Sequence, residues 1–549
     1  MRKHIVLHPV LFAVFPVLFL LAHNVGDFPV LAAAKPAAVA VAIACILWGG
    51  LRLVAGTWTK AALIVSLFIL LATSSTHIAD RLWRMDATIA GVNLIGPRMV
   101  GIALIAIAVG TAAMVVRTKR NLAGVTKALN VVSACLLIAP VFTIARAHAR
   151  EFGKRPFVQM VADLPAASIA TRAPARRPHI FYIVLDGYSR PDNIAAIYGH
   201  DDSDLTKFLV SRGFKVAPHA TTNYAFTFAS LASTLNMRYL DDMSSPENKN
   251  TRARDISIEL VAHNRVRTLL AGQGYKLVSF LTGFYATEIK DADMLLGDPW
   301  QLGEFEEGIL RTAVAMPDST KVSQERRRVL YEFEKLPELA KSQEPLFVIA
   351  HIMSPHPPYV FGKDGGPSGI REYYWTRTGD RLIGPRRITR SQDEQFYRDQ
   401  VSFVNEKAAR AIDGILANSK VDPIIIVQAD HGHSAFLDHR SIENTYLADR
   451  MSILAAYHLP LGGDRVIYDA MTPVNSFRLI LNYYFGTSFA KLPDRNYFIF
   501  LEGSARFVDV TARIGSPADR EVYERLRNKD YFDMPGDKAV AMAASSSAE

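Results

Sequence analysis

Long apolar runs dominate the beginning of the chain, and a mixed pattern of apolar and polar residues follows them. Each run approaches the roughly 20 residues that an α-helix needs to cross a bilayer. The second run reaches this length only if residues 30–34 are added. The pattern therefore predicts a transmembrane domain of five helices within residues 1–146. The apolar runs cover residues 5–21, 36–51, 61–78, 100–116 and 128–145.

Lysine and arginine in the short connections predict the orientation of these helices, because both residues resist translocation. More of them lie on the side of the amino terminus, which should be cytoplasmic. With an odd number of spans, everything after residue 145 lies outside the membrane. A cleaved signal peptide is the alternative to the first span, but four more spans follow it. The cytoplasmic set is Arg2, Lys3, Arg52, Lys60, Arg117, Lys119, Arg120 and Lys127, against Lys35, Arg81, Arg84 and Arg98.

From residue 179 onward, short β-rich runs alternate with longer helical patterns. Apolar residues such as Tyr397, Val401 and Val404 recur every three or four positions in 391–418, which predicts an amphipathic helix. The alternation favours an α/β fold, with a mostly parallel sheet between two layers of helices. The predicted strands are 179–185, 275–281, 346–352 and 423–428, and 255–271 is another predicted helix.

The chain beyond the transmembrane domain divides into three predicted parts. Residues 147–178 carry basic and apolar residues and then become rich in alanine and proline, which predicts an interfacial helix and a linker. An ordinary connector without lipid contact is the alternative. Residues 179–538 form the extracytoplasmic domain, and 539–549 are typical of a disordered tail.

Composition agrees with two physically different parts. The 549 residues are 50% hydrophobic, and a mean hydropathy of +0.11 is too high for a purely soluble protein. Cys45 and Cys135 are the two cysteines, and both fall in predicted spans, so no disulfide holds the exported domain. The net charge of +9 favours anionic lipid headgroups over nucleic acid at an outward location. The topology signal explains part of this excess equally well.

Polar residues gather where the predicted strands end. Asp186 follows the first strand, His351 and His356 lie at the end of the third, and Asp430 with His431 follows the fourth. Ligands of open α/β sheets bind beyond the carboxyl ends of the strands. Asp186 alone is more typical of a turn or a helix cap, whereas two titratable residues after a buried strand favour ligation. Carboxylate and imidazole suit Mn²⁺, Zn²⁺ or Mg²⁺.

A nucleophile is predicted in residues 221–236, which have the pattern of a loop that enters a helix near Phe226. A threonine at a helix amino terminus lies where backbone amides favour an anionic substrate. A metal bound to its hydroxyl would lower the pKa of that group. The alternative is that Thr222, Asn223 or Thr227 only caps the helix.

At these residues the chain resembles the alkaline phosphatase and sulfatase superfamily, in particular lipoteichoic acid synthases and lipid A phosphoethanolamine transferases, over about residues 178–510. The resemblance implies five spans before an exported alkaline-phosphatase-like α/β/α domain. It implies that Asp186, Asp430 and His431 hold a metal. It also implies that Thr227, with Ser230 three positions later, is the nucleophile and a further metal ligand.

The resemblance is looser on the substrate side. His356 is similar to the family's substrate-binding histidine, and His439 to a histidine that follows the Asp-His pair. His433 could replace His439, and a surface histidine without a role is an alternative for His356 and His439. Tyr224 and Asn223 precede the nucleophile and could contact the substrate or only pack.

Departures from the family pattern narrow the expected chemistry. Two-metal members carry an Asp-x-x-x-His segment, whereas this chain has His351 and His356, so one divalent metal is expected, Mn²⁺ or Zn²⁺ with Mg²⁺ as a third option. Sulfatases convert a cysteine in Cys-x-Pro-Ser-Arg into their nucleophile. The exported part has no cysteine, so hydrolysis of sulfate esters is not expected. The disulfides usual in phosphoethanolamine transferases are also missing.

The expected function is transfer of a phosphoryl-linked headgroup, of the phosphoglycerol or phosphoethanolamine type, from an anionic or zwitterionic membrane phospholipid to a glycan or lipid acceptor. The expected location is the inner membrane, with a periplasmic or extracellular catalytic domain. A phosphodiesterase on the same fold is the nearest alternative, and a non-catalytic membrane scaffold is another. The arginine-rich segment 362–390 could cover the site and bind an anionic lipid or glycan, or could be a solvated surface loop.

Overall fold

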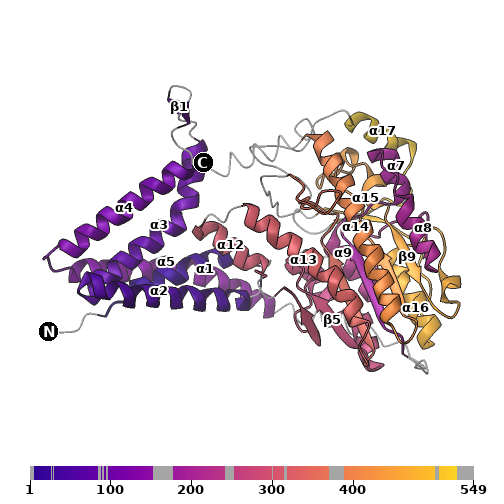
Figure 1. Ribbon diagram of the computed structural model, residues 1–549, viewed down its shortest axis with the longest axis horizontal. Coiled ribbons are helices and arrows are strands. Elements are labelled where there is room, and N and C mark those ends of the chain that lie inside the picture. Colours follow the sequence, from indigo (N-terminus) through magenta and orange to yellow (C-terminus); the bar gives the residue numbers. More distant parts are fainter. Residues whose placement is uncertain are drawn as a thin grey trace. The chain divides into compact units, whose positions relative to one another are not determined.

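Helices form at all five apolar runs in the computed structural model (Figure 1). Three of the described helices are long and apolar enough, by length and composition, to cross a membrane: Val30–Ala55, Trp58–Ser75 and Ala123–Ala149. His8–His23 and Gly101–Arg117 are apolar but shorter, so five spans stay a prediction. The helices are α1 His8–His23, α2 Ala34–Ala55, α3 Trp58–Arg84, α4 Pro97–Arg117 and α5 Ala123–Phe152, with a 3-10 turn η1 at Val30–Ala33 and a short pair of strands, β1 Thr88–Ile89 and β2 Val92–Asn93.

Several predicted segments lie largely outside the part of the chain that the structure describes. These are the interfacial helix and linker within 147–178, of which residues up to 152 belong to α5, the arginine-rich segment 362–390, and the tail 539–549. The predictions for them stay predictions. The structure describes residues 5–25, 28, 30–84, 88–89, 92–93, 97–152, 177–241, 253–298, 301–314, 318–369, 389–500 and 506–527.

Contacts along the chain separate two units, Met1–Arg155 with Leu302–Pro317, and Pro156–Gln301 with Asp318–Glu549. In the first unit, large apolar side chains are exposed and some polar side chains are buried, the reverse of the pattern in a water-soluble protein. Large apolar side chains such as Leu53 and Phe142 are 85% and 65% exposed, while His8 is buried and its Nδ1 lies 2.6 Å from Ser66 Oγ. Apolar exposure on this scale favours contact with lipid.

A short helix from the second half of the chain belongs to the first unit. α12 (Glu304–Val314) packs against α3 and α1. Phe305 is 3% exposed and lies in an apolar cluster with α1 residues, 5.2 Å from the ring of Phe28. Glu306 forms an ion pair with Lys35 at 3.8 Å. The sequence pattern does not predict this return, because an 11-residue helix with a mixed surface is typical of any soluble domain.

Seven strands form the central sheet of the second unit, in the order β4-β9-β8-β3-β7-β5-β6. β3 lies between β7 and β8 and is parallel to both. β5 and β6 continue the parallel pairing at one edge, whereas β9 and β4 pair antiparallel at the other. The prediction of a mostly parallel sheet is confirmed. The strands are β3 Ile180–Leu185, β4 Lys215–Val216, β5 Lys276–Phe280, β6 Met294–Leu296, β7 Leu346–Ile352, β8 Ile424–Gln428 and β9 Ala455–His458, and β10 Tyr497–Phe500 pairs separately with β11 Arg506–Asp509.

The four predicted strands are present as β3, β5, β7 and β8, and each boundary agrees within one residue. Every residue of β3, β7 and β8 is buried, as expected for central strands with helices on both faces. The strands β4, β6 and β9 have only 2, 3 and 4 residues, too few for a periodic signal.

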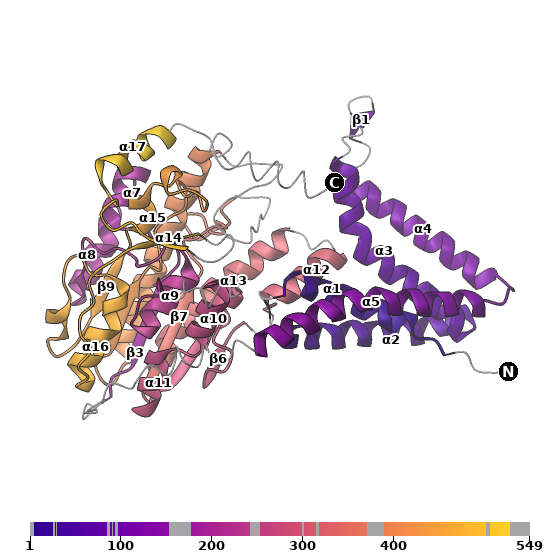
Figure 2. The same ribbon diagram turned by 180° about the vertical axis from the view of Figure 1, so that it is seen from behind.

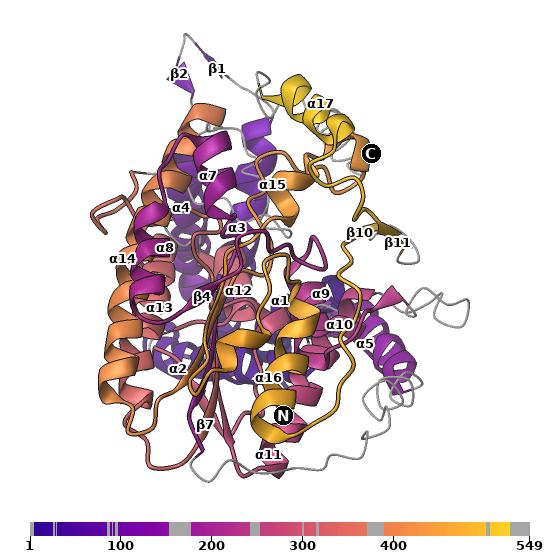
Figure 3. The same ribbon diagram turned by 90° about the vertical axis from the view of Figure 1, so that its right-hand side faces the viewer.

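Helices cover both faces of this sheet (Figure 2, Figure 3). α8, α13 and α14 lie on one face, and α9, α10, α11 and α16 lie on the other. The predicted helix 391–418 is α14, and its predicted apolar stripe, including Tyr397, Val404 and Ile412, is buried. The helices are α7 Pro191–Tyr198, α8 Ser203–Ser211, α9 Thr227–Asn236, α10 Ala253–Ala262, α11 Arg265–Gly272, α13 Asp318–Leu339, α14 Arg390–Asn418, α15 Leu447–Met451, α16 Ser476–Phe485 and α17 Pro517–Leu526, with 3-10 turns η4 Tyr285–Thr287, η5 Ile442–Asn444, η6 Gly463–Val466 and η7 Pro473–Asn475.

The predicted single helix 255–271 is wrong in one respect, because the structure has two helices there, α10 and α11. Asn264 causes the break. Its backbone is extended, and its side chain accepts a hydrogen bond from Arg267 N, so it caps α11. Its Nδ2 donates to Val261 O at the end of α10. An asparagine at such a position favours a helix start over a continuous helix.

Replacing Asn264 with alanine should lower the stability of the second unit by about 1–2 kcal/mol, because the buried cap is lost. Asn264→Ser should lose less, since serine keeps a capping oxygen. Thermal unfolding of the purified protein measures both. Equal midpoints for the alanine variant and the unchanged protein would show that Asn264 does not determine the break.

Candidate metal centre and nucleophile

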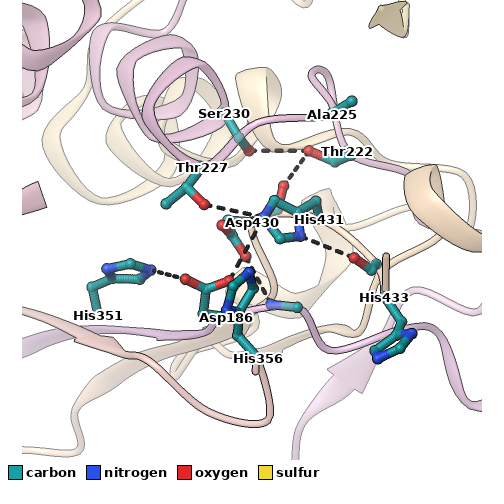
Figure 4. A network of polar contacts seen from close by, with 12 residues as sticks. Asp186, Thr222, Ala225, Thr227, Ser230, His351, His356, Asp430, His431 and His433 are labelled. Carbon is teal, nitrogen blue, oxygen red and sulfur yellow. Dashed lines mark hydrogen bonds and ion pairs between the residues drawn. The ribbon is translucent and has the colours of Figure 1, made fainter. Parts of the chain in front are cut away.

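The carboxyl ends of three neighbouring strands supply most of the site. β3 pairs in register with β7 and β8, so that Val184 lies beside both His351 and Gln428. Asp186 follows β3 directly, and Asp430 lies two residues beyond the end of β8. Because the strands are parallel, these residues reach the same edge of the sheet. The predicted convergence at this edge is present in the structure (Figure 4).

A tight turn after β3 brings Asp186 against the other segments. Gly187 adopts a φ of +73°, which a residue with a side chain rarely adopts. Its N–H donates to Asp430 Oδ1 at 3.1 Å, and a side chain there would meet His356 at 3.4 Å. The backbone N–H of His356 donates to Asp186 O at 2.9 Å. Main-chain bonds therefore hold the three segments together.

Hydrogen bonds at Nδ1 fix the protonation of two histidines. His431 Nδ1 lies 2.9 Å from Gly432 O, and His356 Nδ1 lies 2.6 Å from Pro357 O. A carbonyl oxygen only accepts, so each Nδ1 must carry the hydrogen and donate it. In the neutral imidazole, Nε2 is then left with a lone pair. Both rings therefore present an acceptor to whatever lies beyond Nε2.

His351 belongs to the same edge, although it is not among the predicted ligands. Its Nδ1 lies 2.9 Å from Thr287 Oγ1, and that hydroxyl donates to Phe284 O at 3.2 Å. The imidazole is therefore the donor at Nδ1, and its Nε2 lies 3.1 Å from Asp186 Oδ2. The sequence shows this histidine at the end of a predicted strand, a few residues before His356. Only the register of β3 and β7 shows that it lies beside Asp186.

Acceptors face one another at the centre of the site. His431 Nε2 lies 3.2 Å from Asp430 Oδ2 and 3.6 Å from Asp186 Oδ1. Among the described residues neither of these two carboxylate oxygens has a hydrogen-bond donor, and Asp186, Asp430 and His431 are at most 1% exposed. Buried acceptors without donors are unfavourable unless a cation or a proton lies between them. The arrangement fits a metal ion.

Two overlapping groups could hold such an ion. Within each group the ligand atoms lie within 4.8 Å of one another, and both groups are buried. Ligand atoms about 2.0–2.2 Å from a Zn²⁺ ion lie no more than about 4.4 Å apart, and the separations of 3.1, 3.2 and 3.6 Å between side chains of the site meet this limit. The groups are Asp186 with His356 and His431, and Asp186 with His351 and Asp430.

The surroundings of Asp186 also affect its charge. Burial alone would raise the pKa of this carboxyl, but the imidazoles of His356, His351 and His431 outweigh burial when they carry a proton in place of a metal, and they then hold the pKa below its usual range. Asp186 is therefore ionised at neutral pH. An ionised carboxylate without solvent is a strong ligand for a divalent cation.

Thr227 lies at the first position of α9, as the sequence pattern predicts. Its side chain is 8% exposed, and its Oγ1 lies 3.0 Å from His431 Nε2. Because His431 Nε2 accepts, the threonine hydroxyl is the donor in this contact. The first amides of a helix generally lack partners within the helix, and the helix dipole favours an anion at this end.

Buried hydroxyls tie α9 to the Asp430 segment. Ser230 Oγ lies 3.0 Å from Thr222 Oγ1, and Thr222 Oγ1 donates to Asp430 O. Ser230 and Thr222 are both at most 1% exposed. Ser230, predicted to accompany Thr227, thus connects to Asp430 through one further hydroxyl.

The three histidines considered for the substrate side lie in different surroundings. His356 is in one of the two candidate ligand groups, whereas His439 is in neither and stacks on Phe226 with ring centroids 5.1 Å apart. His433 is held by tyrosines, with Nε2 2.6 Å from Tyr359 Oη and Nδ1 3.1 Å from Tyr198 Oη.

Tyr224 and Asn223 have packing contacts. The hydroxyl of Tyr224 accepts from Leu240 N at 2.7 Å, and its ring stacks on Tyr497. The Asn223 side chain accepts from Val474 N and donates to the carbonyl of Arg495. Both residues are fully buried. Of the two roles considered from the sequence, these contacts favour packing.

Comparison with solved structures finds phosphoethanolamine transferases and sulfatases, the proteins that the sequence resembles. The periplasmic domain of EcEptC from Escherichia coli is 12% identical, with a TM-score of 0.41, over 66% of this chain and 98% of that domain. The zinc complex of the same domain is 11% identical, with a TM-score of 0.40, over 67% of this chain and 98% of that domain. Integral membrane EptA from Neisseria meningitidis is 13% identical, with a TM-score of 0.34, over 86% and 94%.

The sulfatase BT1596, which acts on 2-O sulfated glycosaminoglycan, is 11% identical, with a TM-score of 0.37, over 68% of this chain and 91% of that one. No protein-family model matches the chain. A search of curated proteins also finds no significant match.

Asp430→Asn should weaken binding of Zn²⁺ or Mn²⁺, because it replaces a buried acceptor oxygen. The loss of affinity should exceed about 10–100-fold, which is the typical cost of removing a residue that only contacts a metal ligand. Calorimetry on the purified protein after chelator treatment measures this affinity. Asp494→Asn is the matched control, since Asp494 accepts from Tyr468 and Thr472 away from the site. Equal affinities for the two variants would exclude this group as the metal site.

Proposed function

We propose that this chain is a membrane-anchored, metal-dependent phosphotransferase of the alkaline phosphatase and sulfatase type. It moves a phosphoglycerol or phosphoethanolamine headgroup from a membrane phospholipid to a glycan or lipid acceptor outside the cytoplasm. The main support is the placement of the Thr227 hydroxyl, 3.0 Å from His431 Nε2 and at the start of a helix. An alcohol beside a buried set of acceptors is suited to activation by a metal.

The same proposal includes the topology. Five membrane spans with a cytoplasmic amino terminus would place the residues after 145 outside, in the periplasm or extracellular space. Support comes from the five helices at the apolar runs and from the exposed apolar side chains of the first unit. A site attached to such a unit is suited to a donor that is itself a membrane lipid.

Asp186, Asp430, His431 and Thr227 are the proposed metal ligands, and their oxygen and nitrogen donors suit Mn²⁺ or Zn²⁺, with Mg²⁺ as a third option. When bound, the ion would lower the pKa of the threonine hydroxyl and neutralise charge on the phosphoryl oxygens. His351 and His356 are close enough to complete the ligand set or to contact those oxygens.

The transfer has two balanced steps. Thr227 Oγ attacks the phosphorus of the donor, the bond from phosphorus to the diacylglycerol oxygen breaks, and the threonine proton ends on that oxygen. The acceptor hydroxyl then attacks the same phosphorus, the bond to Thr227 breaks, and the acceptor proton returns to the threonine. His356 or His439 binds the phosphoryl oxygens or carries the proton between these groups.

A phosphodiesterase would use the same first step and replace the acceptor by water. The products distinguish the two reactions. Vesicles that contain phosphatidylglycerol or phosphatidylethanolamine with a labelled headgroup should yield label on a glycan or lipid acceptor. Label found only as free phosphoglycerol or phosphoethanolamine would assign hydrolysis instead of transfer.

Thr227→Ala should lower turnover of the labelled lipid by at least about three orders of magnitude, because no other group replaces the nucleophile. The matched control is Thr234→Ala, since Thr234 lies on the same helix and its hydroxyl donates to the helix backbone, at Ser230 O. The control should keep the activity of the unchanged protein. Turnover by Thr227→Ala within tenfold of the control would reject Thr227 as nucleophile.

A further inference from the structure

Arg450 is one of the largest fully buried side chains of the protein, with 1% of its surface exposed. It lies on the short helix α15. Burying a guanidinium is costly unless its N–H groups are hydrogen-bonded. Such a residue is therefore expected where its hydrogen bonds hold parts of the structure that must not move.

Two of these hydrogen bonds reach the two loops that carry the proposed chemistry. Arg450 Nε donates to Ala225 O at 2.8 Å, two residues before Thr227. Arg450 Nη1 donates to Gly432 O at 3.2 Å, directly after His431. One rigid, planar group thus spans the nucleophile loop and the Asp-His loop.

The carbonyl of Gly432 connects Arg450 to His431 itself. This oxygen accepts from His431 Nδ1 at 2.9 Å as well as from Arg450 Nη1. The Nδ1 bond fixes the ring and points Nε2 at Thr227 Oγ1. Partners that orient a ligand histidine in this way typically control metal affinity.

The backbone around Arg450 leaves little room for adjustment. Gly432 N donates to Arg450 O at 2.8 Å, and a side chain at Gly432 would clash with Asp449 O. The first amides of α15, at Leu447 and Ala448, donate to the buried carboxylate of Asp519. α15 is therefore a fixed support from which the guanidinium extends.

We propose that Arg450 is a positioning residue that sets the separation between the Thr227 hydroxyl and His431 Nε2. The proposal deepens the function proposed above and rests on it. The two hydrogen bonds described above go to main-chain carbonyls and not to the reacting atoms. Its effect comes through the carbonyls of Ala225 and Gly432, which lysine, with a single nitrogen, cannot bridge in the same geometry.

Arg450→Met and Arg450→Lys test this, with Arg478→Met and Arg478→Lys as matched controls. Arg478 also donates to two carbonyls on separate segments, Met237 O and Ala490 O. Neither of these carbonyls belongs to the site. For each variant we would measure kcat and KM on labelled lipid at saturating metal, Zn²⁺ affinity by calorimetry, and the thermal midpoint.

Arg450→Met should lower kcat by about 100-fold, the typical cost of a misplaced reacting group, with KM changed by less than about threefold. Its Zn²⁺ affinity should fall by about 10–100-fold. The kcat and Zn²⁺ affinity of Arg450→Lys should lie between those of Arg450→Met and those of the unchanged protein. The Arg478 variants should lose stability but keep kcat and Zn²⁺ affinity. Equal losses of kcat and affinity in both series would overturn the proposal.

Two further outcomes are decided by the same measurements. If both Arg450 variants fail to fold while both Arg478 variants fold, the role of Arg450 is structural and the proposal is wrong. If the unchanged protein turns over no phospholipid, the proposed function fails. Zn²⁺ affinity then tests separately whether Arg450 orients His431. Weaker Zn²⁺ binding in the Arg450 series than in the Arg478 series supports this role of Arg450, and equal binding rejects it.

Discussion

Lone pairs from two carboxylates and three imidazoles face one another at the end of the central strands, where these side chains are at most 6% exposed. Main-chain hydrogen bonds hold this arrangement against mutual repulsion. Gly187 donates to Asp430, His356 N donates to Asp186 O, and carbonyls orient His356 and His431. The fold thus keeps acceptors together that would separate if their backbones were free, and α9 begins beside them with Thr227.

Much of this edge of the sheet could be predicted from local sequence. Runs of β-branched residues gave strand ends to within one residue, and polar residues directly after them gave Asp186, Asp430 and His431 as candidates. The start of α9 followed from the change of pattern near Phe226, and the resemblance to the superfamily singled out Thr227 there. These features depend on a few neighbouring residues, which is why periodicity and capping rules found them.

The remaining features depend on contacts between distant residues. His351 could not be assigned before the register of β3 and β7 was known, because only that register places it beside Asp186. The break at Asn264 depends on a side chain that bonds both helices. Arg450 gives no signal in sequence, since its partner Ala225 lies 225 positions away.

The return of α12 to the first unit has a practical consequence for work on the second unit alone. A truncated protein that begins at residue 177 would retain α12 but lose α1 and α3, against which this helix packs. Phe305 and Ile309 would then lose their apolar partners, and exposed apolar surface of this kind promotes self-association. A soluble version is better made by replacing residues 302–317 with a short polar loop as well as removing the amino-terminal helices.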